Sequence, residues 1–127
     1  MAKTTVGSIK KISQNEIKRV ESYWGHELWI VNKSEYCGKL LFFKKGHKLS
    51  LHYHRVKDET FYLQSGHLRI RLRYQDGRDE FIDMKPGDSM YIPPGLMHQM
   101  EGIENSELFE FSTQHFDDDS YRVEKGV

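Results

Sequence analysis

Apolar and polar side chains alternate along much of the chain with a period of two, which is typical of β-strands buried on one face. Residues 67–73 give the clearest case, with three aliphatic residues predicted on one face and three arginines on the other. A short apolar run predicts a strand over residues 37–43. Further strands are predicted over residues 27–31, 49–53, 60–65, 79–84, 88–92, 97–101 and 108–113. Glycine or proline stands in many of the gaps, and Asp76-Gly77 is typical of a hairpin turn. Short strands separated by turns predict an all-β sandwich or barrel.

The two ends of the chain show weaker patterns. Isoleucine and valine recur between residues 9 and 21 at roughly helical spacing, which predicts one or two helical turns there. A length of 127 residues fits a single domain. Within it we expect an N-terminal arm over residues 1–15 and a C-terminal tail over residues 114–127.

Composition and charge argue against several classes of protein. Nineteen basic residues balance nineteen acidic ones, so the chain has no overall positive field to hold nucleic acid or an anionic membrane. No apolar stretch approaches the ~20 residues that span a bilayer, and the first residues lack the apolar core of a signal peptide. The single Cys37 cannot form an internal disulfide. We therefore expect a cytoplasmic protein with no nucleic-acid or membrane partner.

Histidines give the strongest chemical signal. His52 and His54 lie two apart on a predicted strand, so their imidazoles point the same way and can bind one ion together. Glu59 follows after a short turn, and His98 comes just after a Pro-Pro-Gly turn. Three imidazoles and one carboxylate suit a divalent ion of iron, manganese, nickel, cobalt or zinc. Four such ligands would leave coordination positions open for substrate or water, which is typical of a catalytic site.

The spacing of these residues resembles the two-part signature of the cupins. The matching positions are Gly46, His52, His54, Glu59, Gly66, Gly87, Pro93, Gly95 and His98. One position departs from the signature: Gly102 stands where cupins often have Asn, which is not a metal ligand. The resemblance implies a small jelly-roll barrel that holds the metal ion in its lumen and assembles as a homodimer.

A closer resemblance, over about residues 18–124, is to the cupin domain of type II mannose-6-phosphate isomerases. It rests on Tyr23-Trp24-Gly25-His26-Glu27, on Leu49-Ser50-Leu51, on Phe111-Ser112-Thr113, on the acidic run 117–119 and on Arg122. The chain departs from that family at His52, where members often have Gln. The resemblance implies aldose–ketose isomerisation of a sugar or sugar phosphate, and its alignment suggests Lys57 and Arg122 as phosphate contacts.

The implied reaction moves a proton between neighbouring carbons, which requires a metal ion to stabilise the enediolate and a base to carry the proton. Glu110 is our candidate base, and an outward, solvated carboxylate is an equally good interpretation of its strand. Strand parity with His52 also places Lys48 and Ser50 toward the lumen. Lys48 would then suit an anionic substrate, and a rim ammonium without a ligand is the alternative.

The remaining histidines and the cysteine are interpreted as structural or solvated. His67 and His115 are expected in solvent, and His47 is out of phase with the predicted metal ligands and should face away from them. His26 lies in a segment that matches the isomerase family, so a place in the pocket is the less favoured of two interpretations. Cys37 opens an apolar strand, which predicts a buried and unreactive thiol.

Three functions therefore compete: a sugar or sugar-phosphate isomerase, an iron-dependent dioxygenase and a non-catalytic sugar-binding protein. The ligand set alone does not separate the first two, because three histidines and one glutamate also serve iron dioxygenases.

Assembly follows from the same strand parity. If His52 and His54 point into the barrel, Leu49, Leu51 and Tyr53 should point out and form an apolar stripe that needs a cover. The predicted cover is the N-terminal arm, which carries Val6, Ile9, Ile12 and Ile17. The arm would fold back on its own chain or cross to the second subunit of a homodimer.

Overall fold

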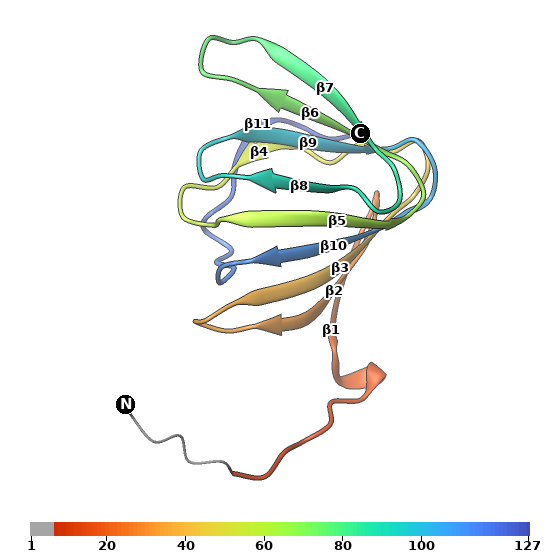
Figure 1. Ribbon diagram of the computed structural model, residues 1–127, viewed down its shortest axis with the longest axis vertical. Helices are drawn as coiled ribbons and strands as arrows, with labels where there is room; N and C mark the ends of the chain where they lie inside the picture. Colours follow the sequence, from red (N-terminus) through yellow and green to blue (C-terminus); the bar gives the residue numbers. More distant parts are fainter. Residues whose placement is uncertain (1–6) are drawn as a thin grey trace.

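The computed structural model describes residues 7–127, and nearly all of its regular structure is β-strand (Figure 1). The helical part of these residues is one short 3₁₀ turn, and no helix among them could cross a membrane. The elements are η1 (Gln14–Glu16), β1 (Lys18–Ser22), β2 (Gly25–Asn32), β3 (Cys37–Phe43), β4 (Leu51–Tyr53), β5 (Glu59–Ser65), β6 (Leu68–Arg73), β7 (Asp79–Met84), β8 (Ser89–Ile92), β9 (Met97–Gly102), β10 (Ser106–Ser112) and β11 (Tyr121–Glu124).

These strands form two antiparallel sheets. One sheet has the strand order β1-β2-β3-β10-β5-β8, and the other has the order β11-β4-β9-β6-β7. From β3 onward the chain passes from one sheet to the other at almost every connection, the β6–β7 hairpin being the exception. Such crossing is the topology of a jelly roll, so the predicted all-β class is confirmed.

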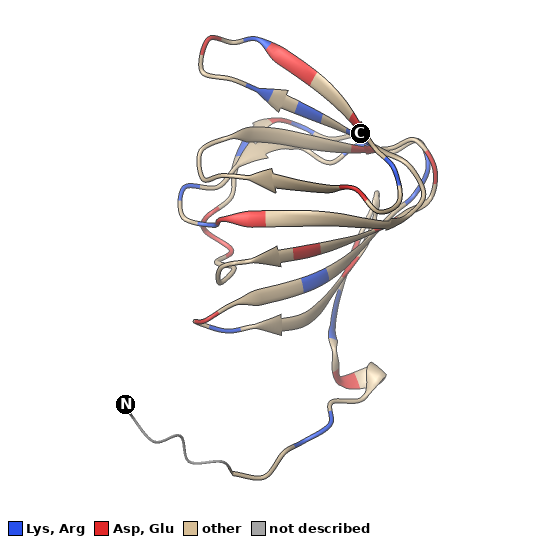
Figure 2. Ribbon diagram, viewed as in Figure 1, with Lys and Arg blue, Asp and Glu red and all other residues tan. Residues whose placement is uncertain are grey.

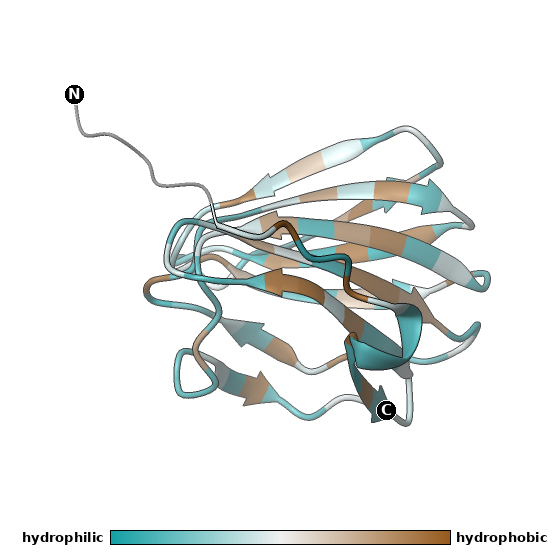
Figure 3. Ribbon diagram, turned by 90° about the horizontal axis from the view of Figure 1, so that it is seen from below, coloured by the Kyte–Doolittle hydropathy of each residue, from teal (hydrophilic) through white to brown (hydrophobic). Residues whose placement is uncertain are grey.

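The apolar core lies between the sheets because inward positions recur at every second residue. Along β3 the buried side chains are Cys37, Lys39, Leu41 and Phe43, and their neighbours are half-buried. Figure 3 shows the resulting alternation of apolar and polar bands along the strands. Several inward positions are nevertheless charged, and Figure 2 shows charged bands inside β3, β5 and β10. The lumen is therefore apolar in one part and strongly polar in another.

The prediction of helical turns over residues 9–21 is wrong for most of that range. The structure has a single 3₁₀ turn at η1, and β1 then pairs with β2 along the edge of a sheet. The β1–β2 turn is tight and places Gly25 against the backbone of Phe42, where a Cβ would clash with the Phe42 carbonyl oxygen. Pairing with an existing sheet edge thus outweighs the weak helical pattern. Val6 lies outside the described residues.

The predicted C-terminal tail over residues 114–127 contains a strand. Within it, β11 pairs with β4 and closes the edge of the second sheet, with Arg122 opposite His52. The Tyr53 and Tyr121 rings stack across this pair at 5.1 Å between centroids. The C-terminal segment is therefore part of the barrel wall beside a predicted metal ligand.

The predicted apolar stripe on β4 does not exist as such. Leu51 is fully buried within the single chain, Leu49 packs against the core, and Tyr53 stacks on Tyr121. The regular strand starts only at Leu51, so its parity does not extend back to Leu49. The homodimer stays a prediction, without the stripe on β4 as its support.

Candidate metal centre

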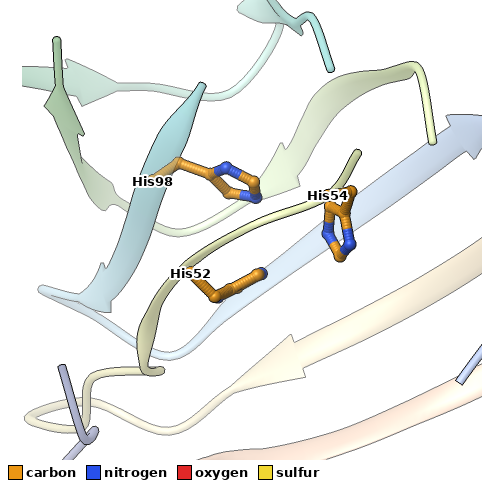
Figure 4. A group of neighbouring side chains, drawn as sticks. All are labelled: His52, His54 and His98. Carbon is orange, nitrogen blue, oxygen red and sulfur yellow. The ribbon is translucent and has the colours of Figure 1, made fainter. Parts of the chain in front are cut away.

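Three imidazoles converge on one space in the polar part of the lumen (Figure 4). His52 lies on β4, His54 follows directly after that strand, and His98 lies on β9 opposite His52. One nitrogen from each ring lies within 4.8 Å of the other two, and all three residues are buried. The structure thus brings together the three histidines that the motif spacing selects.

Hydrogen bonds fix which nitrogen of each ring faces this space. Each Nδ1 lies near a backbone carbonyl oxygen, which can only accept, so Nδ1 must carry the proton and donate it. The bonds are His52 Nδ1 to the Ser50 oxygen at 2.9 Å, His54 Nδ1 to the Asp119 oxygen at 2.6 Å and His98 Nδ1 to the Leu96 oxygen at 2.8 Å. All three Nε2 atoms therefore keep a lone pair, which is what a metal ion requires.

Electrostatics keep two of these rings neutral. Burial, and then the nearby His98, lower the pKa of His52 to about 3. Burial also lowers the pKa of His54, although the charge of Glu59 opposes that shift. A neutral imidazole is the form that ligates a metal, so neither ring has to lose a proton at neutral pH before binding.

Glu59 supplies a carboxylate at the same place. It opens β5, it is 2% exposed, and its Oε2 lies 3.3 Å from His98 Nε2 and 3.7 Å from His54 Nε2. Burial raises the pKa of Glu59, but the nearby His98 and the positive charge of Lys57 outweigh burial and bring it to about 2. The carboxylate is therefore ionised at neutral pH.

Two buried atoms of this cluster test whether a metal ion fits. Among the described residues, Glu59 Oε2 and His98 Nε2 have no hydrogen-bond partner. With the proton of His98 on Nδ1, the two atoms face each other as lone-pair donors, which is unfavourable unless a cation or proton lies between them. His52, His54, Glu59 and His98 together form a nitrogen-rich donor set that suits divalent manganese, iron, cobalt, nickel or zinc.

The four side chains line a cavity of about 170 Å³ together with other polar groups. Ser50 and Glu110 also line it. This position is the one that a substrate contact, predicted for Ser50, and a base, predicted for Glu110, require. Glu110 is 4% exposed, which rules out the outward, solvated alternative for this side chain. The cavity thus combines possible metal ligands with a further buried carboxylate.

A buried lysine connects that carboxylate to the metal ligands. Lys57 Nζ lies 3.0 Å from Glu110 Oε2, 3.3 Å from Glu59 Oε1 and 3.1 Å from His115 Nδ1. Burial by itself lowers the pKa of Lys57, but Glu110 and Glu59 outweigh it and hold the pKa above its usual value. An ammonium has three protons, so these three partners use every donor that Lys57 has.

Sequence reasoning missed two residues of this cavity. Lys39 is 2% exposed and donates to Glu27 at 3.3 Å, while its Nζ also lies 3.2 Å from His115 Nδ1. Its parity with Leu41 and Phe43 could have identified it as inward. His115 was expected in solvent, but its side chain is 14% exposed, and burial followed by the charges of Lys39 and Lys57 lowers its pKa to about 4. No pattern in the sequence indicates that placement.

Two predicted substrate contacts lie outside the cavity. Lys48 precedes the regular part of β4 and lines the outer side of the sheet beside Arg69 and Arg71, so its predicted inward orientation is wrong. Arg122 lines a neighbouring hollow of about 160 Å³, which shares Trp24, Leu49 and Ser50 with the cavity. The phosphate contacts suggested by the alignment are thus separated: Lys57 is inside the cavity and Arg122 is beside it.

The other histidines and Cys37 lie away from the metal ligands. His26 stacks on Phe42 at 5.3 Å between centroids and does not line the cavity. His47 lies against Tyr23, and His67 is half-buried with its Nε2 3.5 Å from an Asp83 oxygen, so it is less solvated than expected. Cys37 is buried as predicted, and burial raises the pKa of its thiol.

Comparison with known proteins identifies the family. Residues 39–111, more than half of the chain, match the sequence profile described as the cupin domain. This chain belongs to the cupin family. Over 93% of its length the fold superposes on an oxalate decarboxylase variant from Bacillus subtilis with a TM-score of 0.79 and 20% identity, covering 34% of that chain.

Two curated relatives of this cupin have different activities. An oxalate decarboxylase of Arthroderma benhamiae is 32% identical over 87 residues, which are 67% of this chain and 20% of the relative. A glucose-6-phosphate isomerase of Thermococcus gammatolerans is 38% identical over 64 residues, which are 49% of this chain and 31% of the relative. The cupin thus spans a third or less of the length of these proteins. They include a sugar-phosphate isomerase, though not specifically a mannose-6-phosphate isomerase.

Proposed function

We propose that this cupin is a metal-dependent enzyme that isomerises a sugar or sugar phosphate between its aldose and ketose forms. The observation that carries the proposal is the cavity itself, in which the cluster of His52, His54, Glu59 and His98 lies beside the buried carboxylate of Glu110. The similarity to a glucose-6-phosphate isomerase supports a sugar phosphate as the substrate class.

Each group in the cavity has a place in such a reaction. A divalent ion held by the three histidines and Glu59 would polarise the substrate carbonyl and stabilise the negative charge that develops when a proton leaves the neighbouring carbon. Glu110 takes that proton from one carbon and returns it to the other. Lys57 and the Ser112 hydroxyl, 3.0 and 3.1 Å from Glu110 Oε2, hold the carboxylate in place.

The phosphate of such a substrate has a better site outside the cavity than inside it. Lys57 has no free donor, and Lys39 is bound to Glu27 and His115 and lies over the Trp29 ring. Within residues 7–127, Arg122 and Lys125 form no ion pair, and both line the neighbouring hollow. Arg122 also stands opposite His52 in the β4–β11 pair, so the two side chains share a face of the sheet. We place the phosphate contact there.

A solvent-exchange experiment tests the reaction. The protein, loaded in turn with manganese, iron, cobalt, nickel or zinc, is incubated with aldose and ketose phosphates in deuterium oxide and followed by NMR. We expect isomer interconversion with deuterium at the exchanged carbon. Glu110→Gln should slow it at least about 100-fold, whereas Glu107→Gln, a matched change on the same strand, should not. Isomerisation at the parental rate in Glu110→Gln would contradict the role of Glu110.

The same preparation separates the alternatives. Oxygen consumption with the iron-loaded protein would indicate a dioxygenase, and ligand-induced thermal stabilisation without any turnover would indicate a non-catalytic sugar-binding protein. A small carboxylate is the second substrate class to test, because two similar proteins are oxalate decarboxylases. Carbon dioxide release from oxalate without isomerase activity would favour that reaction.

The proposed phosphate contact is tested by comparing substrates. Arg122→Ala should raise KM for a phosphorylated sugar by about tenfold and leave KM for the unphosphorylated parent unchanged, since a charge-assisted hydrogen bond is lost only with the former. Lys48→Ala removes a cation on the outer side of the sheet and is the control. Equal effects of Arg122→Ala on both substrates would show that the Arg122 guanidinium does not bind the phosphate.

A further inference from the structure

The C-terminal segment contributes one buried acidic residue to the surroundings of the metal ligands. Asp119 is 6% exposed, although Asp117 and Asp118 beside it are exposed. Its carboxylate accepts hydrogen bonds from three consecutive backbone N–H groups, those of Arg55 at 2.8 Å, Val56 at 3.1 Å and Lys57 at 2.9 Å. These groups belong to the loop that connects His54 to Glu59, so Asp119 holds the backbone between two of the proposed ligands.

The backbone of the same residue also holds one ligand directly. The Asp119 carbonyl oxygen accepts the Nδ1 proton of His54 at 2.6 Å. His52 and His98 instead donate to carbonyls two residues earlier in the chain, those of Ser50 and Leu96. His54 is therefore the one proposed ligand whose ring orientation depends on a residue far away in the sequence.

Neighbouring contacts keep Asp119 in this position. β11 starts two residues later and pairs with β4, and the Arg55 guanidinium lies 4.4 Å from the centroid of the Tyr121 ring. On the other side, His115 and Ser120 line the cavity. The C-terminal segment thus contacts the loop between His54 and Glu59 at three residues, His115, Asp119 and Tyr121.

We propose that Asp119 is a positioning residue for the metal centre, which fixes the Nε2 direction of His54 and the loop that leads to Glu59. Partners that orient a ligating histidine typically change metal affinity by about 10–100-fold when they are lost. The proposal rests on the metal site and not on the isomerase reaction, so failure of one leaves the other standing.

Asp119→Asn is the first test, with Asp118→Asn as the matched control. An amide has one acceptor oxygen for three N–H groups, and its own NH₂ would face donors, so the loop and the carbonyl should shift. We expect Asp119→Asn to weaken zinc binding at least tenfold in chelator competition and to change the visible absorption bands of the cobalt-loaded protein. Asp118→Asn should leave both within twofold. A folded Asp119→Asn protein with parental affinity and parental cobalt bands would overturn the proposal, even if its metal-free form melts at a lower temperature.

A second measurement uses the unsubstituted protein and holds even if the variant does not fold. If Asp119 connects the loop to the metal ion, binding must tighten the loop as well. We expect zinc to slow amide hydrogen exchange of Arg55, Val56 and Lys57 about tenfold, and to leave the hairpin amides of Tyr74 and Gly77 within twofold. Equal changes in both regions, or none in the loop, would contradict the role of Asp119.

Discussion

The polar and the apolar part of the lumen are built by the same strands. Along each of these strands, a shift of two residues leads from one part to the other. On four strands, one inward residue is polar and lines the cavity, and the inward residue two positions away is apolar and belongs to the core, where Leu41, Phe61 and Met100 also form part of the cavity wall. The pairs are Lys39 and Leu41 on β3, Glu59 and Phe61 on β5, His98 and Met100 on β9, and Glu110 and Leu108 on β10. Strand parity determines which residues face inward, and residue type then divides the lumen into a stabilising part and a chemical part.

The comparison has an energetic side. Burying apolar side chains contributes roughly 1.5–3 kcal/mol each, whereas burying charges costs free energy unless each has a partner. In the polar part the cost is contained because Lys57 lies between two carboxylates, yet Glu59 Oε2 and His98 Nε2 stay without hydrogen-bond partners. We therefore expect the apolar part to carry stability and the polar part to carry metal binding, and substitutions on either side test that division.

The largest effect should follow from truncation in the apolar part. Phe43 is fully buried and stacks on Trp24 at 4.9 Å between centroids. Phe43→Ala should lower the free energy of unfolding by about 4 kcal/mol, because it leaves a cavity. Denaturant unfolding measures this change, and zinc affinity of the folded variant should stay within a few fold. A large loss of affinity would show that the two parts are not independent.

Removing the charge that joins two carboxylates should have the next largest effect. Lys57→Met leaves Glu59 and Glu110 buried without their cation and should cost about 3 kcal/mol in unfolding experiments with chelator present. Adding Glu110→Gln removes one of the unpaired charges, so the double variant should recover part of the loss. Strictly additive losses would show that the Lys57–Glu110 pair contributes nothing beyond its separate residues.

Metal binding itself should depend on the polar part alone. His98→Leu removes one proposed ligand and should weaken zinc binding more than about 100-fold, which equals about 2.7 kcal/mol. Metal-free stability should change by only about 1 kcal/mol, since the lost Nε2 has no hydrogen-bond partner and the lost Nδ1 bond to the Leu96 carbonyl contributes about 0.5–1.5 kcal/mol. His47→Leu, outside the cavity, is the control. Parental zinc affinity in His98→Leu would exclude His98 as a ligand.

Sequence reasoning works best where the strands are regular. Alternation and apolar runs predict nine strands that the structure contains, most of them within about two residues of their observed bounds. The same period places His52 and His54 on one face, and motif spacing adds Glu59 and His98. Strand parity fails just before β4, because the backbone is irregular there and the faces predicted for Lys48 and Leu49 by counting back from His52 are wrong.

Residues brought in by tertiary structure are the ones that the sequence does not reveal. β1 and β11 are recognisable only once a sheet edge exists for them to join. His115 and Asp119 lie in an acidic stretch that looks solvated. His115 reaches the cavity and Asp119 reaches the loop after His54 because β11 carries the chain back to β4. Lys39 is the exception, because its parity with Leu41 and Phe43 marks it as inward.

The smallest expected effect is a dependence of stability on pH that originates in the polar part. The folded-state pKa of His115 is about 4, lowered by burial and by Lys39 and Lys57 from an ordinary value of 6.5. Between these values the unfolded chain binds more protons, so this contribution to stability is complete above about pH 6.5 and is lost as the pH falls toward about 4. The lowered pKa of His52 and that of His54 act in the same direction, so the contribution of His115 is measured as the difference between the parent protein and a variant without this imidazole.

With chelator present, the free energy of unfolding of His115→Asn should fall by about 1–2 kcal/mol less than that of the parent protein between pH 7 and pH 4. Asp117 is the carboxylate that faces the outer side of this ring, and Asp117→Asn should lower the pKa of His115 further and steepen the parent curve. Parallel stability curves for the parent and His115→Asn would mean that this imidazole is protonated as readily in the folded chain as in the unfolded one.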